Sequence, residues 1–197
     1  VDQAFIWSGN TEILLALIKS VEDRLNVEAD TQAAGIRVIL LVEDSPFYLS
    51  SILPILYHEM VDQTQALIEE GLTEEHRLLT MRARPKILLA ETFEDAVALY
   101  EHYQPFLLGV ISDIRFPRGG RPDNDAGIEL AGKRMVARIV YVLGAAETAD
   151  LGALSSTEIA HVLTFAHDIE TFGTNISRAI RQGTRGLVEA RKSKGTN

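Results

Sequence analysis

Four short apolar runs along the chain predict β-strands that are buried on both faces. They span residues 36–42, 86–90, 106–112 and 138–143. Continuous apolar runs of this length, in place of alternating ones, are typical of parallel sheets that are covered by helices on both sides. Segments with apolar residues at helical spacing separate the runs. The pattern therefore predicts the order β-α-β-α-β-α-β and an α/β fold with a parallel sheet and helices on both faces.

Helices are predicted where apolar residues recur every three or four positions. The predicted segments are residues 11–25, 46–84, 92–100 and 126–136, with a capping box at Thr92 and Asp95. The polar or small residues 28–35 are expected to form a linker. Gly119 and Gly120 are expected to form a turn.

The segment 46–84 is longer than one helix of a sheet domain needs. We expect it to be mostly helical, to kink at Pro54 and to protrude from the sheet. A lone amphipathic helix gets most of its stability from packing, so its apolar stripe needs a partner. The partner is either residues 11–25 or a second subunit, and the stripe consists of Ile52, Leu56, Met60 and Leu67.

The last third of the chain has two interpretations. A capping-box match at residues 155–158 precedes a helical stripe that runs from Ile159 to Ile180. Alternatively, residues 161–166 form a fifth strand and residues 169–181 a final helix. Periodicity favours the mostly helical interpretation. The fifth strand then has to come from elsewhere, and residues 4–7 are the candidate.

Composition narrows the classes of function. The 197 residues are 46% hydrophobic, which suits one domain with an extension, and the net charge of −9 argues against direct binding to nucleic acid. The absence of cysteine excludes disulfides and thiolate metal sites. No apolar run approaches the roughly 18 residues that span a bilayer, and residues 1–30 carry no signal-peptide pattern. We therefore expect a cytoplasmic protein with no membrane partner.

Acidic residues follow two of the predicted strands. Glu43 and Asp44 end the first strand, and Asp113 ends the third. If these strands are neighbours, three carboxylates converge at the carboxyl edge, where open parallel sheets bind their ligands. Bound Mg²⁺ would relieve the mutual repulsion, and a metal-neutralised carboxylate can attack a phosphoryl group. The alternative is that these acids are only helix caps or solvated loop residues.

Four stretches around these acids resemble the receiver domain of bacterial two-component response regulators. They are residues 38–45, 108–113, 114–117 and 127–130, and the likeness covers roughly residues 36–134. The resemblance implies a flavodoxin-like, five-stranded parallel sheet. It also implies that Asp113 is the phosphoacceptor, that Glu43 and Asp44 hold Mg²⁺, and that the backbone carbonyl of Arg115 is a third ligand. A sensor histidine kinase or another phosphodonor would be the partner, and the domain would regulate an attached or partner protein without being an enzyme itself.

Three further stretches resemble the receiver-bearing region of bacterial phosphoenolpyruvate synthase-like proteins. They are residues 5–9, 22–28 and 81–90. This resemblance implies that residues 1–30 are a strand and helix from the end of a preceding receiver. Residues 36–182 would then be the receiver-like domain and residues 183–197 a basic tail. A fused phosphoenolpyruvate synthase-like region and a second copy of the chain are the further expected partners.

Two departures from the receiver pattern keep an alternative open. A receiver carries Ser or Thr at the end of its fourth strand, where this chain has Gly144 and Ala145. A receiver also carries Lys at the end of its fifth strand, and here His161 and His167 are the nearest substitutes. The alternative is a pseudo-receiver that acts as a protein-interaction module without phosphoryl transfer. A small α/β phosphatase or other enzyme is a third hypothesis.

Overall fold

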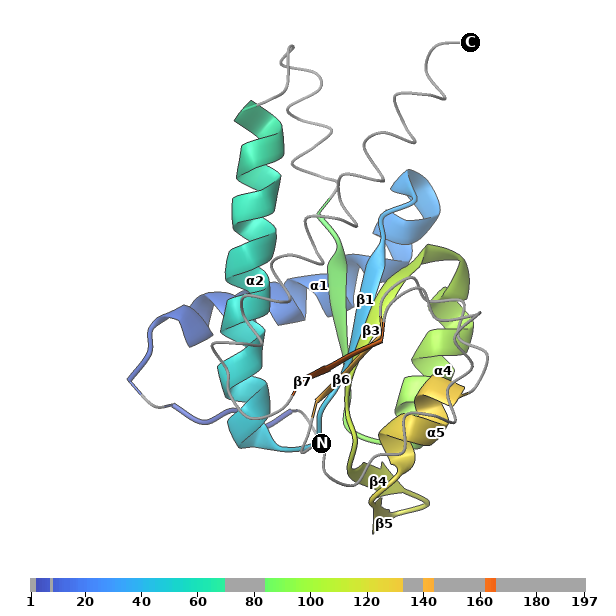
Figure 1. Ribbon diagram of the computed structural model, residues 1–197. Helices are drawn as coiled ribbons and strands as arrows, with labels where there is room; N and C mark the ends of the chain where they lie inside the picture. The colour runs from blue at the N-terminus through green and yellow to red at the C-terminus, as the bar shows by residue number, and fades with distance from the viewer. Residues whose placement is uncertain (1–2, 8, 70–83, 133–139, 144–161, 166–197) are drawn as a thin grey trace.

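Five parallel strands form one sheet in the order β2-β1-β3-β6-β7 (Figure 1). The computed structural model describes residues 3–7, 9–69, 84–132, 140–143 and 162–165. The strands are β1 (Val38–Val42), β2 (Lys86–Ala90), β3 (Leu107–Asp113), β6 (Val140–Leu143) and β7 (Val162–Phe165). Numbered along the chain within this sheet, the order is 2-1-3-4-5, which is the flavodoxin-like order. The predicted fold class is confirmed.

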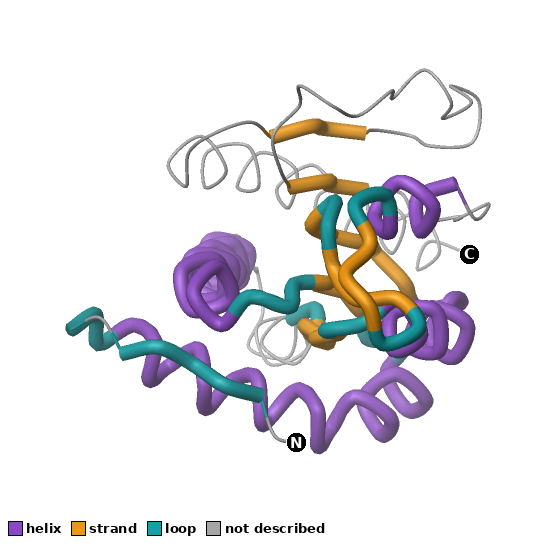
Figure 2. The backbone as a smooth tube through the Cα atoms, turned by 90° about the horizontal axis from the view of Figure 1, so that it is seen from below, coloured by secondary structure: helices purple, strands orange, loops and turns teal. Residues whose placement is uncertain are grey.

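Helices cover both faces of the sheet (Figures 1 and 2). They are α1 (Glu12–Ala34), α2 (Pro46–Glu69), α4 (Phe93–Tyr103) and α5 (Ala126–Gly132), with a 3-10 turn at Gln104–Phe106. Because side chains alternate along a strand, Val38, Leu40 and Val42 of β1 pack with α4 and α5. Ile39 and Leu41 point the other way and pack with α2. The pattern of continuous apolar strands follows from this double coverage.

The long helix α2 finds its partner within the chain. Ile52, Leu56 and Met60 are buried among the sheet residues on that face and Ala16 of α1. These three residues of the expected apolar stripe therefore pack on the sheet and on α1 and need no second subunit. The side chain of Leu67, the fourth member, lies outside the described part of the structure. The helix continues through Pro54, and its last turns extend past the end of the sheet (Figure 1). The predicted helical continuation to residue 84 falls mostly outside the described residues.

Helix α1 runs along the β2 edge of the sheet, from the α2 side to the α4 side (Figure 2). Its Asp23 side chain is fully buried and accepts hydrogen bonds from the Tyr57 hydroxyl and from the backbone N–H of Ile87, both at 2.9 Å. Asp23 also forms an ion pair with Arg84. An edge strand presents backbone groups without a strand partner. The Asp23 carboxylate supplies an acceptor for one such group, the Ile87 N–H of the edge strand β2.

The expected linker at residues 28–35 is wrong, because α1 continues to Ala34. Glu, Ala and Gln in this stretch favour a helix, and Thr31 is buried although it is polar. The helix ends at Gly35, whose φ of 62° suits a glycine in the left-handed conformation. The polar residues of this stretch therefore belong to the exposed face of a helix and not to a loop.

The favoured interpretation of the last third is wrong at residues 162–165. These residues form β7, which pairs with β6 in parallel from Val140↔Val162 to Leu143↔Phe165. Backbone pairing at the free edge of β6 outweighs the helical periodicity, and the Val-Leu-Thr-Phe sequence itself favours a strand. Residues 4–7 form no strand, and the Ile6 N–H donates to the Ser50 hydroxyl at 2.8 Å instead. The remaining expectations for residues 144–161 and 166–197 concern residues outside the described part of the chain.

Within the described ranges, no helix combines the length and the apolar character that crossing a membrane requires.

Replacing Asp23 with Ala should destabilise the fold by about 3–5 kcal/mol, because it leaves the buried Arg84 guanidinium without its carboxylate partner, whereas Lys86 keeps Asp30 at 2.8 Å. Arg84 and Lys86 are 10% and 8% exposed and both lie near this carboxylate. The matched control is Glu22→Ala, which removes a surface ion pair with Lys19 and should cost less than about 1 kcal/mol. Urea unfolding measures both variants. Equal stability of the two would contradict the proposed role of Asp23.

Candidate functional site

The carboxyl ends of β1 and β3 bring three acidic side chains together. The two strands are parallel neighbours, and their register ends at Val42 opposite Ser112. Glu43 and Asp113 therefore leave the sheet side by side, and Asp44 follows in the next position. One carboxylate oxygen from each of Glu43, Asp44 and Asp113 lies within 4.8 Å of the other two. The predicted convergence of these acids is confirmed, while their binding of a metal stays a prediction.

Local backbone groups orient two of these carboxylates. Glu43 is 3% exposed, and its Oε1 accepts a hydrogen bond from the Ser45 N–H at 3.0 Å. Asp113 is partly buried, and its Oδ1 accepts the Ile114 N–H at 2.7 Å. Asp44 is exposed. Both buried carboxylates are thus positioned by the turns that follow their own strands.

The electrostatics of the cluster favour protonation or a cation. Burial raises the pKa of Glu43 to about 7, and the negative charges of Asp113 and Asp44 add to the effect against the Ser45 N–H. Burial also raises the pKa of Asp113, while the backbone N–H groups of Ile114 and Arg115 oppose this rise. Among the described residues, the three carboxylates form no ion pair with a basic side chain. The cluster therefore carries negative charge that nothing in the described structure neutralises by direct contact.

Gly127 is required by its closeness to Asp113. Its N–H donates to the Ile114 carbonyl at 2.9 Å, which ties the start of α5 to the end of β3. A Cβ atom at this position would lie 2.1 Å from the Asp113 carbonyl oxygen, so a side chain cannot fit without moving the backbone. Sequence reasoning found this glycine only through the receiver resemblance, and the close backbone approach is its physical reason.

A short hairpin follows Asp113 and is anchored to the scaffold. Strands β4 (Phe116–Arg118) and β5 (Arg121–Asp123) are joined by Gly119 and Gly120, whose φ angles of 59° and 74° confirm the predicted turn. Arg118 lies over the Phe93 ring at 4.5 Å and pairs with Glu129. Among the arginines close to Asp113 in sequence, Arg118 therefore holds the hairpin against α4 and α5. Arg115 and Arg121 are exposed.

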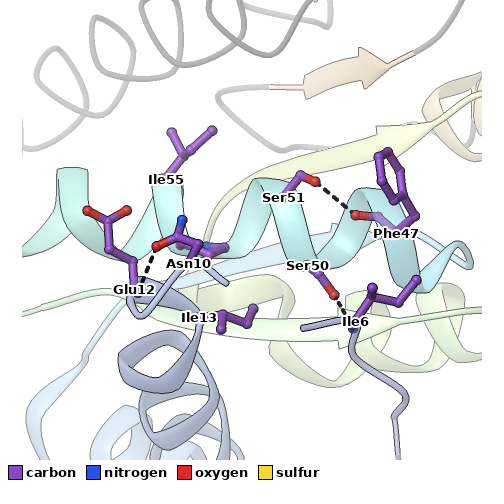
Figure 3. Close-up of a pocket in the computed structure, with 9 residues that line it drawn as sticks. Ile6, Asn10, Glu12, Ile13, Phe47, Ser50, Ser51 and Ile55 are labelled. Carbon is purple, nitrogen blue, oxygen red and sulfur yellow. Dashed lines mark hydrogen bonds between the residues drawn. The ribbon is translucent and has the colours of Figure 1, made fainter. Parts of the chain in front are cut away.

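A separate hollow of about 250 Å³ lies between the N-terminal segment and the start of α2 (Figure 3). It is lined by Ile6, Asn10, Glu12, Ile13, Phe47, Ser50, Ser51, Pro54 and Ile55. The hydroxyls of Ser50 and Ser51 donate to the Pro46 and Phe47 carbonyls, and the Asn10 side chain accepts from the Glu12 N–H. None of the three clustered acids lines this hollow. The acidic cluster is the better candidate for a functional site.

No family model matches the chain, and no curated protein matches it. A solved structure described as the signal receiver domain of a Luxo repressor protein from Vibrio parahaemolyticus is 16% identical. That match covers 78% of this chain and 98% of the other, with a TM-score of 0.39.

The raised pKa of Glu43 predicts a specific pH dependence of stability in metal-free protein. The folded state holds this proton up to about pH 7, whereas the unfolded chain loses it near 4.5. The free energy of unfolding should therefore fall as pH rises between these values, by up to about 3 kcal/mol from this group. Glu43→Gln should reduce this slope and should be more stable than the wild type above about pH 7.

Urea unfolding in the presence of a chelator, between about pH 4.5 and pH 8, measures this linkage. Glu91→Gln is the control, since Glu91 follows the neighbouring strand β2 outside the cluster. Parallel pH profiles for the wild type and Glu43→Gln would show that the carboxylate is not held in an unfavourable environment.

Proposed function

We propose that the chain is a signal-transduction receiver that accepts a phosphoryl group on Asp113 in the presence of Mg²⁺. The observation that carries this proposal is the cluster of three carboxylates at the carboxyl edge of β1 and β3. In a parallel sheet of this order, that edge is where ligands bind. A receiver of this kind regulates an attached or partner protein and is not a metabolic enzyme.

The residues present fit a magnesium ion. Glu43, Asp44 and Asp113 offer only oxygen donors, and their ligand atoms are already close enough to share one ion. The raised pKa values of Glu43 and Asp113 mean that a bound cation would offset a charge that the fold disfavours. The backbone carbonyl of Arg115 is proposed as a further ligand on the strength of the receiver resemblance. Bound Mg²⁺ would supply charge neutralisation for the carboxylates and for the phosphoryl oxygens.

Asp113 is the proposed nucleophile on the strength of the receiver resemblance, and its carboxylate lies within the acidic cluster at the end of β3. The Ile114 N–H holds its Oδ1 and so sets the orientation of the carboxylate. A carboxylate oxygen of Asp113 forms a bond to phosphorus while the bond between phosphorus and the donor breaks, and the donor leaves with that electron pair. The donor is a phosphohistidine of a sensor histidine kinase or a small acyl phosphate. The cytoplasm is the proposed location, and a fused phosphoenolpyruvate synthase-like region is a proposed partner.

The alternative function is a pseudo-receiver that binds a protein partner without phosphoryl transfer. It is favoured by the residues at the ends of the last two strands. Leu143 ends β6 and Gly144 follows it, so this position offers no hydroxyl. Phe165 ends β7, and the chain contains no lysine between Lys133 and Lys192. The two groups that draw in the phosphoryl oxygens of a receiver are thus absent from these sequence positions.

Incubation with acetyl phosphate and Mg²⁺ should add one phosphoryl group to the wild-type chain, as read by intact mass. Asp113→Asn should show no adduct because the nucleophile is gone, and a chelator should prevent the adduct in the wild type. The matched control is Asp125→Asn, an exposed acid near the start of α5 that should be modified normally. No adduct on the wild type would favour the pseudo-receiver. An adduct that persists on Asp113→Asn would place the reaction elsewhere.

A phosphoryl mimic at Asp113 should produce only a weak conformational response. The missing Lys and Ser or Thr contacts remove roughly 2–4 kcal/mol of differential stabilisation. A full population reversal needs about 5.5 kcal/mol. Hydrogen exchange across residues 139–170, with and without beryllofluoride and Mg²⁺, should therefore show little new protection. Strong protection that Asp113→Ala abolishes would mean that a substitute, such as Thr148 or His167, performs the switch.

A further inference from the structure

Helix α1 buries its smaller and more polar face. The side chains that pack into the domain are Ile13, Ala16, Ser20, Asp23, Val27 and Thr31. Four larger apolar side chains of the same helix are instead exposed, with Leu14 at 50%, Ile18 at 65%, Val21 at 47% and Leu25 at 73%. A surface helix ordinarily turns its apolar stripe toward the core. In α1 the buried ion pair of Asp23 keeps the smaller and more polar face toward the domain, so the large apolar side chains face outward.

The four exposed residues, here named the outer stripe, have the spacing of a helix-pairing seam. Leu14, Ile18, Val21 and Leu25 follow each other at intervals of four, three and four residues. This is the repeat by which two helices interlock their side chains along one line. The outer stripe is about 16 Å long. It contains no charged residue, and none of the described residues covers it.

We propose that the outer stripe binds the outer stripe of a second copy of this chain, with the two α1 helices antiparallel. A two-fold axis between Lys19 and Ser20 places Leu14 against Leu25 of the second copy. It places Ile18 against Val21 in the same way, so one surface is complementary to itself. Antiparallel helices also bring opposite ends of the helix dipoles together. The occupant is thus another α1, and the product is a closed dimer.

The exposed area is consistent with such a dimer. The outer stripe and the neighbouring Leu15, which is 45% exposed, together leave on the order of 500 Å² in contact with water, near the upper end for patches on monomeric proteins. A standard interface covers about 800 Å² per partner and has an apolar centre with a polar rim. Glu22 and Arg24 flank the outer stripe and supply such a rim. The surface therefore has the size and composition of an interface centre.

Sedimentation equilibrium of the full chain over a concentration range tests the proposal. We expect the wild type to dimerise and Ile18→Glu to weaken the dimer at least roughly 30-fold, because it places two carboxylates in the apolar seam. Asn26→Asp is the matched control: Asn26 is exposed on the same helix but faces away from the outer stripe, so dimerisation should be unchanged. Asp113→Asn should also dimerise normally, which separates this result from the proposed phosphoryl chemistry.

Two outcomes of this experiment overturn the proposal. One is a wild type that stays monomeric. The other is an Ile18→Glu variant that dimerises as the wild type does. If the wild type is monomeric and Ile18→Glu also lowers the melting temperature, another part of the same chain covers the outer stripe, because a solvent-exposed site would tolerate the change.

Cysteine cross-linking tests the antiparallel arrangement, since the chain contains no cysteine of its own. The double variant Leu14→Cys with Leu25→Cys should form disulfide-linked dimers readily, because these positions face each other between the two copies. Leu25→Cys alone should cross-link poorly. Equal cross-linking of the single variant would show that the helices are parallel and would overturn the antiparallel arrangement.

Discussion

The parallel register between β1 and β3 decides what this domain can do. Val42 lies opposite Ser112, so the chain leaves both strands at the same level, with Glu43 and Asp113 next to each other. A shift of one residue would turn every side chain of a strand to the other face of the sheet. It would also separate the acids, because each is fixed by its own neighbours. The Glu43 N–H donates to the Ala90 carbonyl, and the Asp113 carboxylate accepts from the Ile114 N–H. The double burial of β1 by α2 and by α4 with α5 holds this register.

Helix α1 covers the β2 edge of the same sheet. Asp23 joins three parts of the chain, because it binds Tyr57 of α2, Arg84 before β2 and the backbone of β2 itself. Burying this carboxylate costs desolvation free energy, which these partners offset. To bring Asp23 to its partners, α1 must turn its face of smaller residues toward the domain. The consequence is an outward line of large aliphatic side chains. The contact that completes the sheet edge and the surface proposed for dimerisation are therefore two sides of one constraint.

Much of the fold followed from patterns that are local in sequence. The second strand was predicted with its observed bounds, Lys86–Ala90, because a short apolar run between polar segments has few other solutions. The meeting of the acids was also predictable, since the carboxyl ends of adjacent parallel strands share an edge. Asp23 was missed because an acid between Glu22 and Arg24 looks like part of an exposed polar face, and its partners lie 34 to 64 positions away. Strand β7 was assigned to a helix because pairing with β6 is a long-range interaction that periodicity does not record.

The central claim is that Glu43, Asp44 and Asp113 form one divalent-cation site. Amide NMR spectra with substoichiometric Mn²⁺ locate such a site directly, because the paramagnetic ion broadens signals close to it. The account predicts that the signals of residues 43–45 and 112–115 broaden first, that excess Mg²⁺ restores them, and that Asp113→Asn loses the effect. Broadening that is uniform, or that centres on another acidic group such as Glu28 and Asp30, would contradict the account.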